Sequence, residues 1–158
     1  MNLLAIVRVL AILSSGLSAG IIFGDRMGNT FARPSLSAAE FIRFQQIQNR
    51  YFARMMPVVL LTAVASGILW LILLRAQWNS PQFALASLGT AAMIAGVALT
   101  RAVNIPINNQ LERWSEASPP ANLREIWGRW EKMHTIRTIL WMGAFALQTL
   151  ALGAFGDE

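Results

Sequence analysis

Residues 127–141 read WGRWEKMHTIRTILW and hold the only histidine of the 158-residue sequence. The three tryptophans of this stretch, His134 and Arg137 follow one another at steps of three, four, three and four residues. On an α-helix these steps place all five side chains on one face. The stretch runs directly into an apolar segment, residues 138–155, which is typical of a membrane-spanning helix. We therefore predict a helix that presents a cation, an imidazole and indoles at a membrane boundary.

The composition also indicates a lipid environment. Hydrophobic residues make up 55% of the chain and charged residues only 13%, against about 25% in soluble domains. The net charge of +5 does not indicate nucleic acid as a partner, because the basic residues lie between apolar runs and fit a membrane surface better. The absence of cysteine excludes disulfides, thiolate metal sites and cysteine nucleophiles.

The apolar segments predict a single all-α domain over residues 1–158, an integral membrane four-helix bundle with helices 2 and 4 extended beyond the membrane. The expected spans are residues 3–23, 58–74, 83–100 and 138–155. Gly24, Gly28 and Pro34 indicate that the first helix ends in a connection over residues 24–34.

Several local signals refine this outline. Ser37 and Glu40 have the spacing of a capping box, which predicts a helix start, and this helix should continue through Pro57 with a kink. Gly89 and Gly96 predict close helix packing in the third span. A last helix should run from residue 122 to about residue 155.

The basic residues predict the orientation in the membrane. Only Arg8 and Arg75 lie on one side. The other side carries five basic residues between the first and second spans (Arg26, Arg33, Arg43, Arg50 and Arg54) and six between the third and fourth spans (Arg101, Arg113, Arg124, Arg129, Lys132 and Arg137). By the positive-inside rule both long connections are cytoplasmic and both termini are external, in a plasma or inner membrane. The polar residues of the two connections can then converge.

His134 is the candidate for acid–base chemistry, because imidazole exists in either protonation state near neutral pH. Glu131, one turn earlier, is positioned to orient it, unless Glu131 pairs with a lysine or arginine. The alternative is that His134 is an ordinary interfacial polar residue. Taken singly, Trp127 and Trp130 fit headgroup anchors; together beside His134 and Arg137 they also fit a flat wall for a planar ligand. The other polar candidates are Gln45, Gln46, Asn49, Asn104, Asn108 and Asn109.

Other functional classes lack their residues. The sequence has no glycine-rich phosphate loop, Ser-His-Asp arrangement or HExxH motif. No predicted span contains Asp or Glu, which argues against a proton-coupled transporter. With one histidine and no cysteine, a structural zinc cage would need carboxylates or a second subunit, although single-histidine haem ligation stays open.

Two motifs carry a resemblance. Asn104-Ile105-Pro106-Ile107-Asn108 follows the third span, and a Trp-x-x-x-His-x-x-Arg element spans residues 130–137. With Gln46 and Asn49 before the second span, the chain resembles the anthrone oxygenase-like family of small membrane proteins. The resemblance implies a four-helix membrane bundle. Some fungal relatives oxidise anthrones to anthraquinones with dioxygen, and no classical cofactor is implied.

The leading hypothesis is therefore a membrane oxidoreductase that binds a small planar, anthrone- or quinone-like molecule at the cytoplasmic membrane boundary. His134 would remove an acidic C–H or O–H proton, and Arg137, Asn104 and Asn108 would stabilise the resulting oxyanion. Trp127, Trp130, Asn109, Asn49 and Gln46 would contact the ligand. The alternatives are a non-catalytic protein that binds lipid, a quinone or a partner helix, and a haem or metal protein. A homo-oligomer is open.

Overall fold

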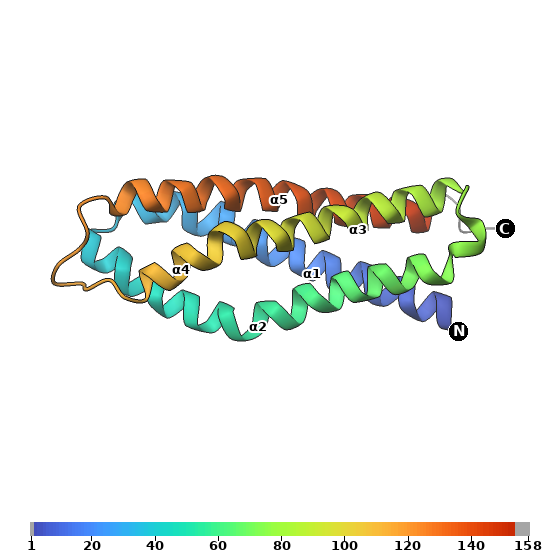
Figure 1. Ribbon diagram of the computed structural model, residues 1–158, viewed down its shortest axis with the longest axis horizontal. Coiled ribbons are helices and arrows are strands. Elements are labelled where there is room, and N and C mark those ends of the chain that lie inside the picture. The colour runs from blue at the N-terminus through green and yellow to red at the C-terminus, as the bar shows by residue number, and fades with distance from the viewer. Residues whose placement is uncertain (1, 154–158) are drawn as a thin grey trace.

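The computed structural model describes residues 2–153, which form an all-α bundle of long helices (Figure 1). The helices are α1 (Leu3–Ala32), α2 (Ala38–Leu73), α3 (Pro81–Leu99), α4 (Ile105–Leu111) and α5 (Leu123–Gly153). A π-helical turn, η3 (Thr100–Asn104), joins α3 to α4, and short 3₁₀ turns, η1 (Arg33–Ser35) and η2 (Arg75–Gln77), end α1 and α2. The predicted four-helix bundle is confirmed, with α3, η3 and α4 forming one continuous helical arm.

Four helical segments are long and apolar enough to cross a membrane, namely Leu3–Ser35, Ala38–Leu73, Pro81–Leu111 and Leu123–Gly153. Large apolar side chains cover the outside of the bundle, and Leu13, Met55 and Ile139 are each at least 66% exposed. Water would oppose so much exposed apolar surface, whereas lipid accepts it. The protein is therefore an integral membrane protein. The first residue of α1 and the last of α5 lie at the same end of the bundle (Figure 1).

The first helix is longer than predicted, and the expected connection over residues 24–34 is wrong. α1 continues to Ala32 and only then turns through η1, which contains Pro34. Gly24 and Gly28 lie on an exposed face where a Cβ would meet nothing within 4 Å. A glycine costs a helix only about 1 kcal/mol, so two of them on an outer face do not end it. The extra turns carry Asp25 inside a helix.

The second helix begins as predicted. The Ser37 side chain accepts a hydrogen bond from the Glu40 N–H, and the Glu40 carboxylate accepts from the Ser37 N–H at 2.9 Å, which completes the capping box. α2 then runs through Pro57 for 36 residues, about 54 Å at 1.5 Å per residue. α2 bends in its middle, away from the α3–α4 arm (Figure 1). The cavity described below is lined by residues of both α2 and the arm.

The third and fifth helices pack closely at the predicted small residues. A Cβ at Gly89 would lie 3.1 Å from the Ala144 backbone oxygen, and one at Gly96 would lie 2.6 Å from Nε1 of Trp141. Only a residue without a side chain permits this approach. α5 is described to Gly153, so residues 154–155 of the predicted last span lie outside the described residues.

The helical arm changes its winding before Pro106. The Ile105 N–H donates to the carbonyl of Thr100, five residues back, and this produces the π-helical turn of η3. Proline has no N–H and cannot donate a hydrogen bond to the carbonyl four residues earlier. The wider π-helical turn accommodates this missing hydrogen bond, and the helix continues without a break. The turn places Asn104 and Asn108 against α5, as the hydrogen bonds below show.

The Gly96–Trp141 contact leads to the first prediction. Gly96→Ala should lower the free energy of unfolding by about 1–3 kcal/mol, because the new methyl group overpacks a buried indole. Thermal unfolding in detergent measures the change. Gly143→Ala on α5 is the matched control, since a Cβ at this position would meet nothing within 4 Å and helix propensity favours alanine. Equal loss of stability in both variants would contradict the packing argument.

Candidate functional site

One cavity of about 410 Å³ lies inside the bundle between α2 and the α3–α4 arm. Its polar wall contains Asp25 from α1, Gln45, Gln48 and Asn49 from α2, Thr100, Arg101, Asn108 and Asn109 from the arm, and His134 and Arg137 from α5. Trp127 and Trp130 line it from α5, and apolar residues of α2 such as Phe52, Met56 and Leu61 line its mouth. Polar residues from α1, α2, the α3–α4 arm and α5 therefore lie together around one cavity.

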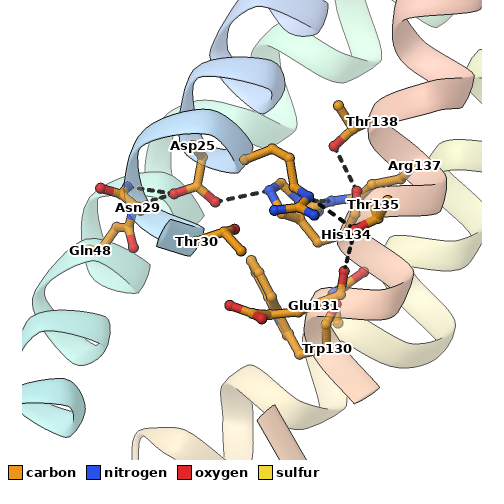
Figure 2. A network of polar contacts seen from close by, with 12 residues as sticks. Asp25, Asn29, Thr30, Gln48, Trp130, Glu131, His134, Thr135, Arg137 and Thr138 are labelled. Carbon is orange, nitrogen blue, oxygen red and sulfur yellow. Dashed lines mark hydrogen bonds and ion pairs between the residues drawn. The ribbon is translucent and has the colours of Figure 1, made fainter. Parts of the chain in front are cut away.

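Asp25 is the centre of the polar network (Figure 2). Its Oδ1 accepts hydrogen bonds from Asn29 Nδ2 at 2.6 Å, Gln48 Nε2 at 2.7 Å and Arg33 Nη2 at 2.9 Å. Its side chain is only 8% exposed. A carboxylate can be buried in an apolar bundle when donors replace its water, and these three side chains supply that replacement.

Arg33 is the cation that balances Asp25. Its side chain is 2% exposed, and its Nη2 lies within 3.2 Å of both carboxylate oxygens. Arg33 Nε also donates to Gln45 Oε1 at 3.0 Å. The guanidinium carbon lies 5.4 Å from the ring centroids of both Trp127 and Trp130, so the arginine also makes cation–π contacts. Arg33, counted above among the membrane-surface charges, is instead part of the core.

His134 is fully buried between Asp25 and Arg137. Its Nδ1 accepts a hydrogen bond from Arg137 Nε at 3.0 Å, and its Nε2 lies 3.1 Å from Oδ2 of Asp25. The Nε2–H is imperfectly aligned with the carboxylate oxygen, so the second contact is a close electrostatic one more than a strong hydrogen bond. Figure 2 shows the imidazole between the carboxylate of α1 and the guanidinium of α5.

Arg137 has no carboxylate partner among residues 2–153. Its Nη1 donates to Thr100 Oγ1 at 3.2 Å, its Nε donates to His134, and its guanidinium carbon lies 5.4 Å from the Trp130 ring. All of these partners are neutral acceptors or rings. The cavity wall therefore presents a guanidinium that forms no ion pair within the described part of the chain.

The indoles form a stack along one side of the site. The Trp127 and Trp130 rings are parallel to within 14° at a centroid distance of 4.4 Å, and Trp130 lies 4.8 Å from the His134 ring. Asn108 Oδ1 accepts from Trp130 Nε1 at 2.8 Å, and Asn104 Nδ2 donates to the Trp130 carbonyl at 3.2 Å. The two asparagines thus hold the position of Trp130 from the opposite helix.

The predicted site residues separate into two groups. His134, Arg137, Asn108, Asn109, Asn49, Trp127 and Trp130 line the cavity. Asn104 and Gln46 do not: Asn104 braces α5, and Gln46 Nε2 donates to the carbonyls of Leu111 and Trp114 at the end of α4. Glu131 accepts from Trp127 Nε1 and lies 3.7 Å from Arg33, so Asp25 takes the place beside His134 that Glu131 was expected to fill.

Asp25, Arg33 and Gln48 are site residues that the sequence patterns did not predict. A signal is present, because Asp25, Asn29 and Arg33 recur at steps of four residues and share one helix face. The glycines and the proline of residues 24–34 hide this signal, because they indicate a connection. The buried carboxylate also removes the argument that the membrane helices contain no acid, since Asp25 lies within the first apolar helical segment.

The family model described as anthrone oxygenase matches residues 44–147. The chain belongs to the anthrone oxygenase family. The match covers both motifs that carried the resemblance, and it begins after Asp25 and Arg33. No curated protein and no solved structure matches the chain significantly. Among residues 2–153 no three His, Asp or Glu side chains gather as metal ligands would.

The buried ion pair leads to the second prediction. Arg33→Met should lower the free energy of unfolding by about 3–5 kcal/mol, because it leaves the Asp25 charge buried without its cation. Thermal unfolding in detergent measures the loss, with the exposed Arg43→Met on α2 as control. Adding Asp25→Asn to Arg33→Met should restore part of the stability. If the single and double variants unfold alike, the ion pair does not carry this stability.

Proposed function

We propose that the protein is a membrane oxygenase that binds a small planar aromatic molecule with an ionisable hydroxyl or carbonyl group, such as an anthrone, in the cavity beside His134. The observation that carries this proposal is the pairing of His134 Nδ1 with Arg137 Nε at 3.0 Å on the cavity wall. One of these groups can take a proton, and the other can hold the negative charge that remains.

The cavity suits such a ligand in size and lining. Its volume of about 410 Å³ lies in the usual range of small-molecule sites, roughly 300–1,000 Å³. Most of the accessible lining is apolar, and its polar groups include His134 and Arg137. A flat ring system with one polar oxygen matches this lining.

The ligand reaches the cavity from the membrane. Phe52 and Leu61 on α2 and Ile105 on α4 line the cavity and are themselves 36–59% exposed, so its mouth is apolar on both sides. Polycyclic molecules partition into lipid, and a mouth between two membrane helices admits them without passage through water. Arg101 on the arm also lines the cavity and is exposed, which fits a position at the cytoplasmic boundary.

The distance between the two groups favours O–H over C–H deprotonation. In an anthrone the acidic C–H lies across the central ring from the carbonyl oxygen, whereas His134 Nδ1 and Arg137 Nε are neighbours. The pair therefore acts on one oxygen: His134 takes the hydroxyl proton of the enol tautomer, and Arg137 holds the resulting oxyanion. Asn108, which lines the cavity, adds an amide.

The oxidation then follows from the chemistry of the anion. Its charge extends to the ring carbon opposite the oxygen, and that carbon gives electrons to dioxygen and forms a C–O bond. The peroxide takes the proton held by His134. Loss of the remaining C–H proton with cleavage of the O–O bond gives the second carbonyl. One anthrone and one dioxygen thus become one anthraquinone and one water.

His134 provides the third prediction. His134→Ala should lower the rate of oxygen consumption with an anthrone by about 10²–10⁴-fold, the usual contribution of a general base. An oxygen electrode with purified protein in detergent measures it, corrected for the spontaneous oxidation of the substrate. Equal rates in the wild type and in a folded variant would remove the proposed base. If binding persists without turnover in the wild type, the alternative of a non-catalytic lipid or quinone binder is supported instead.

The mouth of the cavity provides the fourth prediction. Ala53 on α2 lines the cavity, and Ala53→Phe should weaken the binding of an anthraquinone at least about tenfold by filling this space. Quenching of tryptophan fluorescence measures binding, because Trp127 and Trp130 line the same space. Ala65→Phe is the control on the same helix, exposed and outside the cavity. Equal affinities in the two variants would place the ligand elsewhere.

A further inference from the structure

We propose that Asp25 is a positioning residue that holds His134 in the tautomer with its proton on Nε2, so that Nδ1 is the nitrogen that takes the ligand's proton. The inference rests on the proposed function for its catalytic consequence, but the tautomer itself is a property of the protein alone. Asp25 lies outside the residues that the family model matches.

The Arg137 side decides the state of Nδ1. A guanidinium nitrogen carries only protons to donate and keeps them at any ordinary pH. Arg137 Nε lies 3.0 Å from His134 Nδ1 and donates to it, so Nδ1 must present a lone pair. A proton on Nδ1 would place two donors against each other at this distance. The contact therefore favours a neutral imidazole with its proton on Nε2.

The Asp25 side decides the state of Nε2. An ionised carboxylate only accepts, so the Nε2 that lies 3.1 Å from Oδ2 must carry the proton. Asn29, Gln48 and Arg33 together hold Asp25 ionised and fixed in place, because each donates to its Oδ1. Oδ2 is left to Arg33 and His134. Both neighbours of the imidazole thus select the same tautomer.

In this arrangement the Nδ1 lone pair of His134 becomes available as a base only when a ligand displaces Arg137 from it. In the structure the Nδ1 lone pair accepts a hydrogen bond from Arg137 Nε. A ligand hydroxyl that enters between them can donate to Nδ1 and then, as an oxyanion, accept from Arg137. Asp25 beside Nε2 stabilises the imidazolium that forms. The other charged groups that act on the imidazole are Arg33 from η1 and Arg137 from α5, and Glu131 lies beside Arg33. The elements α2 and the arm present the neutral Gln48 and Thr100.

The first test is spectroscopic and needs no substrate. His134 is the only histidine, so protein made with histidine labelled at both ring nitrogens, and purified with a histidine-free tag, reports this residue alone. Nitrogen chemical shifts near neutral pH should show a neutral imidazole protonated on Nε2. An imidazolium, or a proton on Nδ1, in the wild-type protein would overturn the proposal without any variant.

The second test removes the acceptor and is the fifth prediction. In Asp25→Asn the amide can donate to Nε2, so only Arg137 still favours the Nε2-protonated form, and the spectrum should show a larger share of the Nδ1-protonated form. The kcat for anthrone oxidation should fall about 10²-fold or more, with little change in KM, because a base in the wrong tautomer binds but does not react. Asp25→Glu should restore the wild-type tautomer and part of kcat. Glu125→Gln, exposed in the first turn of α5, is the control.

The outcomes separate this inference from the proposed function. If Asp25→Asn keeps the wild-type tautomer and kcat, Asp25 is not a positioning residue. If the tautomer shifts while neither Asp25→Asn nor His134→Ala affects turnover, the tautomer assignment holds and the proposed base fails. If KM rises and kcat is unchanged, Asp25 acts on ligand binding and the proposal is overturned.

Discussion

The burial of one carboxylate constrains most of this structure. Asp25 lies in the first long apolar helix, and its side chain is only 8% exposed, so water offers its carboxylate little solvation. A lone charge there would cost several kcal/mol, so other elements must supply donors. Arg33 comes back from the end of α1, Gln48 comes from α2, and His134 comes from α5. Because these donors come from the α1 end, α2 and α5, the contacts with Asp25 hold three helices together beside the cavity.

The α3–α4 arm completes the arrangement from the other side. Close contacts at Gly89 and Gly96 hold α3 against α5, and the π-helical turn then rotates the asparagines toward Trp130. α2, by contrast, bends away from the arm in its middle (Figure 1). The tight α3–α5 pair positions the polar groups, and the separated α2 leaves room for a ligand beside them. The close α3–α5 packing therefore fixes the polar side chains, whereas the cavity lies between α2 and the arm.

Sequence patterns predict the bundle well because membrane helices depend on local rules. Apolar length, the capping box at Ser37 and the small residues of α3 each act within one or two turns. The same rules place His134 and Arg137 on one face. They do not find Asp25, because two glycines suggest a connection, while burial of the other face keeps the helix intact. Which hydrogen-bond donors surround Asp25 depends on how the helices pack in three dimensions. The spacing of residues in the sequence does not show these contacts.

A simpler explanation of the polar cluster is that it only stabilises the packing of the helices. The charges at the site argue for a binding role as well. In a purely structural cluster we would expect every charge to have a partner and the space beside it to be filled with side chains. Asp25 and Arg33 do neutralise each other, but Arg137 faces the cavity with neutral partners among the described residues. The cavity beside it stays open instead of being packed with side chains. A buried cation without an ion-pair partner costs stability, and such charges are often found at functional sites. The arrangement therefore fits a binding site whose negative charge arrives with, or forms on, the bound molecule.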